Sequence, residues 1–264
     1  MTKSGVGYFL GWLGERLDIK RNIILVYHSI DNSGSVLSES PENFRTQMLY
    51  LKKYGFISIP LRKYLAHFLL NHSLPDRTFV LTFDDGYKSI FHNARPVIKE
   101  LGLHATVFFT SGYAGKTAGW KMPGNVPKFP LMTWDELRIL KDEGTDIQSH
   151  TVNHPYLTTL NREDIEKEIV ENKKEIESNL GHRVDILAYP HGNYTNIVIE
   201  VVKKIGFISS VTIDFGSNGY GDDLFRLRRI SSRAFINMSM FKACVWGTYE
   251  PLLNARRFLF TKQA

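Results

Sequence analysis

Two adjacent aspartates, Asp84 and Asp85, are the most informative residues of this 264-residue chain. The apolar run 79–83 leads directly into them and Gly86 follows, which is the pattern of a buried strand that ends in two carboxylates. Two like charges at neighbouring buried positions are costly unless a cation or a proton compensates them. The pair therefore predicts a site in which one carboxylate binds a metal ion and the other moves protons.

Histidines follow two further predicted strands. His150 and His154 lie four residues apart, directly after the predicted strand 145–149, and His191 comes two residues after Tyr189 at the end of another strand. A histidine pair alone is weak evidence, because histidines often serve as caps or hydrogen-bond partners. Two histidines and one carboxylate, however, form a ligand set that leaves positions open for water and substrate. Their joint occurrence at strand ends favours a divalent metal site.

The elements that must position these residues alternate between strands and helices. Short apolar and β-branched runs predict strands at 23–27, 56–59, 79–83, 105–109, 145–149, 185–189, 208–213 and 225–230. Capping residues and terminal glycines predict helices at 41–55, 61–70, 89–101, 134–144 and 162–181, and residues 112–130 are predicted to form a long loop. Continuous apolar strands that alternate with helices predict a parallel sheet closed as a barrel, with its active site at the C-terminal ends of the strands.

Length and composition predict one domain over residues 1–264, with a core at about 22–232 and helical extensions at both ends. The net charge of +6 favours anionic surroundings, such as a phospholipid surface or an acidic glycan. No nucleic-acid partner is expected, because the lysines and arginines are scattered along the chain. The single cysteine, Cys244, rules out an internal disulfide and suits a reducing compartment.

The N-terminal apolar stretch 6–13 has two interpretations. It is too short and too rich in glycine for a convincing signal peptide, and no stretch approaches the roughly 20 apolar residues of a membrane span. A helix packed on the domain is the simpler interpretation, and peripheral membrane contact by Tyr8, Phe9 and Trp12 is the alternative. Residues 258–260 carry the same ambiguity. We expect a cytoplasmic protein that works at the inner face of the membrane if this contact is made.

Residues 82–86 and 149–154 resemble the first two motifs of the polysaccharide deacetylases, the NodB-homology enzymes of carbohydrate esterase family 4. The resemblance extends from about Ile23 to Ile230. It implies an α/β fold, a distorted (β/α)7 barrel of NodB-homology type. It also implies metal-dependent removal of acetyl groups from the N-acetylated sugars of a polysaccharide or glycolipid.

Motif matching also assigns roles. Asp84 is the implied general base, and Asp85, His150 and His154 are the implied ligands of zinc, with cobalt, nickel or manganese as alternatives. The third motif, around His191, implies a backbone N–H that stabilises the oxyanion. Trp120, Tyr189 and Arg228 are the candidate substrate contacts.

The chain departs from the common family pattern at two places. Residues 187–192 lack the arginine that many relatives carry in the third motif, and residues 224–230 lack a histidine acid. The subgroup that deacetylates poly-β-1,6-N-acetylglucosamine looks permuted, with a Tyr-His pair on an early strand, and Tyr27-His28 resembles that pair. His28 is therefore the candidate general acid. Arg228 or Arg229 is the candidate replacement for the missing arginine.

Two other functions remain compatible with the sequence. The same metal site could cleave an O-acetyl ester or an amide outside a sugar, or the barrel could bind glycan without catalysis. The intact set of Asp84, Asp85, His150 and His154 argues against a catalytically silent barrel. The substrate's length and linkage and the oligomeric state are left open.

Overall fold

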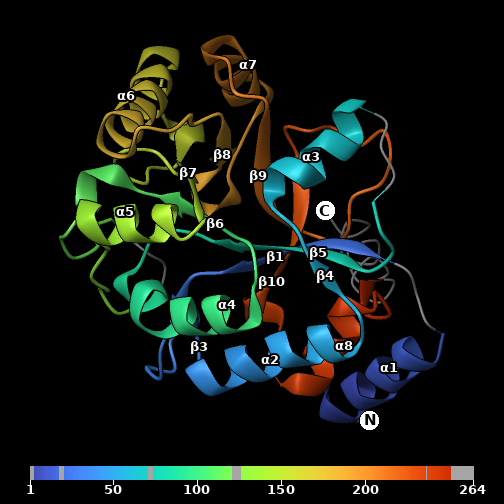
Figure 1. Ribbon diagram of the computed structural model, residues 1–264. Helices are drawn as coiled ribbons and strands as arrows, with labels where there is room; N and C mark the ends of the chain where they lie inside the picture. The colour runs from blue at the N-terminus through green and yellow to red at the C-terminus, as the bar shows by residue number, and fades with distance from the viewer. Residues whose placement is uncertain (1–2, 18–20, 71–73, 121–125, 236, 251–264) are drawn as a thin grey trace.

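Seven strands pair in parallel and close into a ring at the centre of the computed structural model, which describes residues 3–17, 21–70, 74–120, 126–235 and 237–250 (Figure 1). In order around the ring they are β1 (Asn22–Tyr27), β5 (Thr78–Phe83), β6 (Ala105–Phe109), β7 (Asp146–Ser149), β8 (Ile186–Ala188), β9 (Ser209–Phe215) and β10 (Leu227–Ser231). The ring closes because β1 pairs with both β5 and β10. The predicted (β/α)7 barrel is confirmed.

Three short strands lie outside the ring. The strand β4 (Ile57–Ser58) pairs with Thr78 and Phe79, the first two residues of β5, whereas β6 pairs with β5 only from Leu81 onward. It forms an eighth strand on one side of the ring. The strands β2 (Ser29–Ile30) and β3 (Ser38–Glu39) form a separate parallel pair that follows β1.

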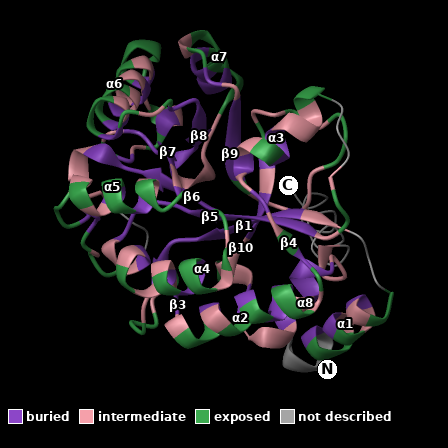
Figure 2. Cartoon of the chain, viewed as in Figure 1, coloured by how far each residue is buried: buried purple, intermediate pink, exposed green. Residues whose placement is uncertain are grey.

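Helices surround the ring, with buried residues on the side that faces it and exposed residues on the side that faces solvent (Figure 2). They are α2 (Pro41–Lys53), α3 (Leu61–Leu70), α4 (Arg95–Leu101), α5 (Trp134–Asp142), α6 (Arg162–Leu180), α7 (Asn196–Ile205) and α8 (Met238–Val245). The predicted caps are present: Ser40 accepts from the backbone N–H of Asn43 at the start of α2, and Thr133 and Glu136 form a reciprocal capping box on α5. Local sequence signals therefore set these helix starts.

The predicted helix 89–101 is not a uniform α-helix. Its first part, Ile90–Ala94, is a π-helix, and α4 begins only at Arg95. Pro96 stands at the second position of α4 and has no backbone N–H to donate to the preceding turn. A change in the hydrogen-bond ladder is therefore expected at this point.

The long loop 112–130 is tied to the segment that carries the two aspartates. Tyr87 forms an isolated bridge with Leu131, the backbone N–H of Lys88 donates to Pro130, and the N–H of Met132 donates to Gly86 at 3.0 Å. The described part of the loop is thus fixed to the residues that follow Asp85.

One buried amide attaches α6 to the ends of two strands. Asn172 accepts from the Ser149 hydroxyl at 2.6 Å, and its amide group contacts the carbonyls of Phe109 at 3.0 Å and Thr151 at 2.7 Å. Its side chain is fully buried. Because a buried carbonyl without a partner is costly, this amide holds the C-terminal ends of β6 and β7, and therefore His150, in place.

The N-terminal helix α1 (Lys3–Leu17) packs against α8 (Figure 1). Glycines make this approach close: a Cβ atom at Gly14 would lie 2.3 Å from Cβ of Trp246. On the same helix Tyr8 and Phe9 are 72% and 52% exposed. The predicted membrane contact stays a prediction, as does the cytoplasmic location, and residues 258–260 lie outside the described residues. No described helix is both long and apolar enough to cross a bilayer.

Candidate active site

Three potential ligand atoms converge at the C-terminal end of the barrel. Oδ1 of Asp85, which follows β5, lies 3.3 Å from Nε2 of His150 and 3.1 Å from Nε2 of His154, both of which follow β7. All three side chains are buried, and their ligand atoms lie within 4.8 Å of one another. The structure therefore brings together the three residues predicted to bind metal.

Unusual backbone conformations produce this convergence. Five non-glycine residues in the described ranges have a positive φ, and four of them belong to this site: Asp85 (67°), Thr151 (67°), His154 (57°) and His191 (58°). Side chains other than glycine are strained in this left-handed region. At this site the strained residues all lie in the turns that follow the strands.

The three converging groups fit a divalent metal ion. Oδ1 of Asp85 is buried and faces the Nε2 atoms of both histidines, and a buried carboxylate oxygen is costly unless a cation or a proton compensates its charge. Nδ1 of His150 lies 2.8 Å from the carbonyl oxygen of Ala188. A proton donated there leaves the lone pair of Nε2 free for a metal. Two imidazoles and one carboxylate suit zinc and other first-row metals.

Without an ion, the neighbouring carboxylates favour the protonated form of His150. Burial alone would lower the pKa of His150, but the hydrogen bond and charge of Asp85 outweigh it and raise that pKa. Burial would raise the pKa of Asp85, yet His154 and His150 hold it well below its usual value. An incoming metal ion must therefore displace a proton, so its affinity is expected to fall as the pH falls.

The neighbouring Asp84 has a different partner, Arg229 on β10. Nη1 and Nη2 of Arg229 donate to Oδ1 and Oδ2 of Asp84 at 2.7 and 2.6 Å, and both side chains are buried. Arg229 is held in turn by the carbonyl of Thr212 at 2.7 Å and the hydroxyl of Thr82 at 3.1 Å. Although burial raises the pKa of Asp84, the charge and hydrogen bonds of Arg229 outweigh it and lower that pKa. Asp84 therefore stays ionised.

The two arginines proposed from the sequence lie on opposite faces of β10. Arg229 points into the barrel, whereas Arg228 donates to Asp222 at 2.9 Å and lines a separate surface hollow with it. Neighbouring residues on a strand point to opposite faces, so only one of the two can reach Asp84. The structure does not place Arg228 in the catalytic pocket.

His28 follows β1 and lies beside the aspartates. β1 and β5 pair up to Tyr27 and Phe83, and the backbone N–H of Asp84 donates to the carbonyl of Tyr27 at 3.0 Å. His28 is 9% exposed, and its Nδ1 has no hydrogen-bond partner in the described part of the chain. Burial lowers its pKa, and the charges of Asp85 and Asp84 partly offset that effect.

Three other predicted residues occupy different places. His191 lines the pocket, stacked on Tyr156 with 3.8 Å between ring centroids, and burial together with His154 lowers its pKa to about 4. Tyr189 also lines the pocket, but its hydroxyl donates to the carbonyl of Phe225 at 3.0 Å. Trp120 does not line the pocket; its ring stacks on that of His154 at 4.6 Å, so it supports a candidate ligand.

The pocket that joins these residues has a volume of about 200 Å³. Sequence reasoning missed several residues that line it: Val36, Leu37, Val126, Tyr156, Ile213 and Arg233. Of these, only Tyr156 had a usable signal, since it follows His154 by two residues in the same turn. The others come from loops, a 3-10 turn and, for Ile213, the strand β9, and their position at the site depends on the closed barrel.

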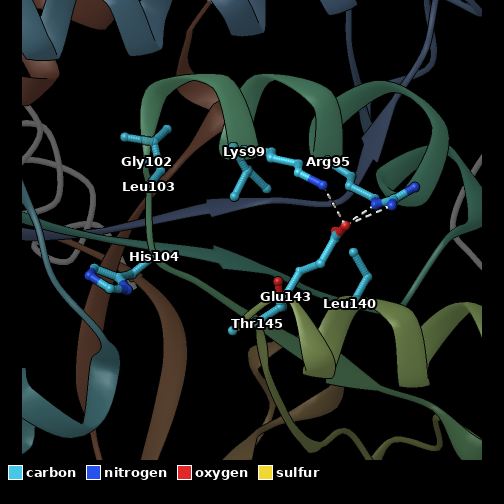
Figure 3. Close-up of a pocket in the computed structure, with 10 residues that line it drawn as sticks. Arg95, Lys99, Gly102, Leu103, His104, Leu140, Glu143 and Thr145 are labelled. Carbon is cyan, nitrogen blue, oxygen red and sulfur yellow. Dashed lines mark hydrogen bonds and ion pairs between the residues drawn. The ribbon is translucent and has the colours of Figure 1, made fainter.

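A larger cavity, of about 390 Å³, lies at the other end of the barrel, where β6 and β7 begin (Figure 3). Its central carboxylate, Glu143, accepts from Arg95 at 2.6 and 2.8 Å and from Lys99 at 3.0 Å. Glu143 is thus engaged by both cations, and the lining holds none of the residues predicted for metal binding or proton transfer. The smaller pocket, which holds the two aspartates and the histidines, is therefore the better candidate for an active site.

Comparisons with known proteins find deacetylases that act on polysaccharides. The family model described as polysaccharide deacetylase matches residues 71–209, more than half of the chain. YxkH of Bacillus subtilis (strain 168), a candidate polysaccharide deacetylase, is 26% identical over 84% of this chain and 75% of its own length. The poly-β-1,6-N-acetyl-D-glucosamine N-deacetylase of Staphylococcus aureus (strain MRSA252) is 24% identical over 64% of this chain, which spans 59% of that enzyme.

A solved structure supports the fold. IcaB from Ammonifex degensii superposes with a TM-score of 0.74 at 21% identity, over 87% of this chain and 97% of that chain. At this level of identity the likeness concerns the barrel and not the substrate.

Substitution of the converging ligands is expected to remove metal binding. Asp85→Asn and His154→Ala should each weaken the binding of zinc by at least about 100-fold, because each removes a ligand atom from a buried set of three. Zinc content after gel filtration and calorimetric titration measure this effect. The control is His104→Ala, an exposed histidine at the other end of the barrel, which should bind zinc as the wild type does. Full zinc retention by either ligand variant would contradict the assignment.

Removal of Arg229 is expected to destabilise the fold by leaving Asp84 buried and unpaired. Arg229→Met should cost about 3–5 kcal/mol of the free energy of unfolding, measured by urea denaturation. Combination with Asp84→Asn should restore much of this loss, because no unpaired charge is left. The control is Arg228→Gln on the same strand, which breaks a partly exposed ion pair and should cost about 0–1 kcal/mol. Equal losses in the two single variants would contradict the buried-pair interpretation.

Proposed function

The chain belongs to the polysaccharide deacetylase family, and we propose that it is a metal-dependent hydrolase that removes acetyl groups from N-acetylated sugars of a polysaccharide or glycolipid. One observation carries this proposal: the adjacent aspartates have separate partners within one pocket. Asp85 faces two histidines, and Asp84 is held by Arg229. The first set is suited to a cation and the second to proton transfer. The O-acetyl esterase and silent-barrel alternatives are not favoured, because the curated S. aureus relative is named as an N-deacetylase.

Hydrolysis of an amide needs activation of both the carbonyl and the water. A divalent ion held by Asp85, His150 and His154 supplies a Lewis acid that polarises the carbonyl and lowers the pKa of water. Asp84, kept ionised by Arg229, accepts the proton of the attacking water. Each of its oxygens has two lone pairs, so the hydrogen bonds to Arg229 leave one free for this proton.

The oxyanion formed by this attack needs hydrogen-bond donors. The turn Pro190–Gly192 lies at the edge of the pocket, and His191 and Gly192 both have a positive φ there. Within this turn the backbone N–H of Gly192 donates to the carbonyl of Tyr189 at 2.8 Å, which leaves the backbone N–H of His191 as the proposed donor to the negative charge. A Cβ atom at Gly192 would lie 2.1 Å from Cγ1 of Ile213, so the turn packs too closely for any other residue.

The departing amine nitrogen needs a proton, and His28 is the proposed donor. It lines the same pocket as Asp84 and Asp85 but is attached to a different strand. Burial lowers the pKa of His28 and makes its protonated form a stronger acid, whereas the charges of Asp85 and Asp84 raise that pKa and favour the protonated form. His28 can therefore give up its proton once negative charge is neutralised nearby.

The shape of the pocket suggests how the sugar is bound. Its volume of about 200 Å³ is below the range of about 300–1,000 Å³ common for drug-sized ligands, so it fits an N-acetyl group and one sugar ring. Tyr156 is 39% exposed and stacks on His191, which presents a flat aromatic surface at the edge. A sugar ring can pack on such a surface. With the S. aureus relative, this favours a substrate containing N-acetylglucosamine.

Acetate release from N-acetylglucosamine oligomers tests the proposed function. The zinc-loaded protein should release acetate and expose free amines, and chelation followed by dialysis should abolish this activity until zinc is restored. Asp84→Asn is the negative control, because it removes the proposed base; a loss of about 100- to 10,000-fold is expected. No release from any N-acetylated sugar by the metal-loaded wild type would refute the proposal.

His28→Gln tests the general acid. We expect kcat to fall by about 100- to 10,000-fold while zinc content stays unchanged, because His28 is proposed to donate a proton and not to bind metal. The decline of activity at high pH, where the acid loses its proton, should also disappear in the variant. A variant with full turnover would show that another group protonates the amine.

A further inference from the structure

Arg233 is a cation on the catalytic pocket that the reaction scheme does not use. It is the only lysine or arginine among the described residues that line this pocket. It follows β10 in the short 3-10 turn Ser232–Ala234, and its backbone N–H donates to the Ser231 hydroxyl at 3.3 Å. The residue is exposed, and no hydrogen bond or ion pair of its guanidinium is found with any described residue.

Other arginines near this strand are paired. Arg229 binds Asp84, Arg228 binds Asp222, and Arg226 lies 3.5 Å from Asp223. An arginine without a carboxylate partner is ordinary on an open surface, where water solvates it. Arg233, however, lies on the wall of a pocket whose two carboxylates are each paired with other groups. Its charge is therefore available to a ligand in the pocket.

The order of strands shows which part of the substrate Arg233 can meet. β10 pairs with β1, and Ser231 lies opposite Val26, two residues before His28. Phe235, two residues after Arg233, packs against Tyr27 with 5.9 Å between ring centroids. Arg233 therefore follows β10, on one side of β1 and His28, whereas Asp85 follows β5 on the other side of β1 and the two candidate histidine ligands follow β7. The proposed acid His28 faces the amine nitrogen, which stays attached to the sugar.

We propose that Arg233 binds an oxyanion carried by the sugar portion of the substrate, such as a phosphate ester or a uronic carboxylate. This inference rests on the proposed function and narrows its substrate class to anionic N-acetylated glycans. A guanidinium presents a planar pair of N–H donors that matches both phosphate and carboxylate oxygens. The acetyl group is bound toward the histidines, and the anionic substituent lies beyond the sugar nitrogen on the side of β10.

The test compares matched substrates in three proteins: wild type, Arg233→Gln and Arg226→Gln. The substrates are a neutral N-acetylglucosamine disaccharide, the same disaccharide with a reducing-end phosphate, and one with a neighbouring uronic acid. For Arg233→Gln, kcat/KM on the preferred anionic substrate should fall by about 10- to 100-fold, mainly through KM, because a charge-assisted contact is lost. Its value on the neutral disaccharide should change by less than about 2-fold. Arg233→Lys should recover part of the loss, and Arg226→Gln should match wild type.

The two anionic substrates distinguish the source of the oxyanion. A loss confined to the phosphorylated disaccharide identifies a phosphate ester, and a loss confined to the uronic one identifies a carboxylate. Equal losses on neutral and anionic substrates, or no loss on any of them, would overturn the inference.

A binding measurement separates this inference from the proposed function. Calorimetric titration of the metal-free protein with each disaccharide does not need turnover. Tighter binding of an anionic ligand by wild type than by Arg233→Gln supports the oxyanion site even if no acetate is ever released. Equal affinities for neutral and anionic ligands in both proteins would reject the site even if the neutral disaccharide is deacetylated.

Discussion

The buried pair of Asp84 and Arg229 is the interaction on which the site depends. Two adjacent carboxylates at a buried strand end would repel each other, and each would be costly to ionise. Arg229 binds both oxygens of Asp84, at 2.7 and 2.6 Å, and thereby leaves Asp85 to face His150 and His154. Because Arg229 binds only Asp84, the two aspartates differ: Asp84 is an ionised carboxylate, and Asp85 is a candidate metal ligand.

Closure of the barrel brings Asp84 and Arg229 close enough to form this ion pair. Asp84 follows β5 and Arg229 belongs to β10, 145 residues later, and β1 lies between these two strands and pairs with both. The same closure brings His28 from the first strand to the aspartates. In this arrangement a proton donor can come from either end of the chain, because the first and last strands of a closed ring are neighbours. The same closure places Arg233, which follows the last strand β10, at the pocket.

Much of the fold followed from local signals. Caps at Ser40, Thr133 and Asn161 mark helix starts as predicted, because a side chain that accepts the first N–H groups acts within three residues. The π-helical start of the segment 89–101 was not predicted, since apolar spacing does not distinguish it from an α-helix. Trp120 was predicted as a substrate contact, and its stacking on His154 was not predicted, because that contact depends on how the long loop folds back.

The sequence by itself determined which residue types stand at the strand ends: the two aspartates, the histidine pair and Tyr27-His28. Strand periodicity and motif spacing are local properties, so they can be read without coordinates. Only the tertiary structure decided that Arg229 and not Arg228 holds Asp84, that Tyr156 and Arg233 line the pocket, and that the carboxylate of the larger cavity is engaged by two cations. These choices depend on register and on closure of the ring, since a shift of one residue sends a side chain to the opposite face of its strand.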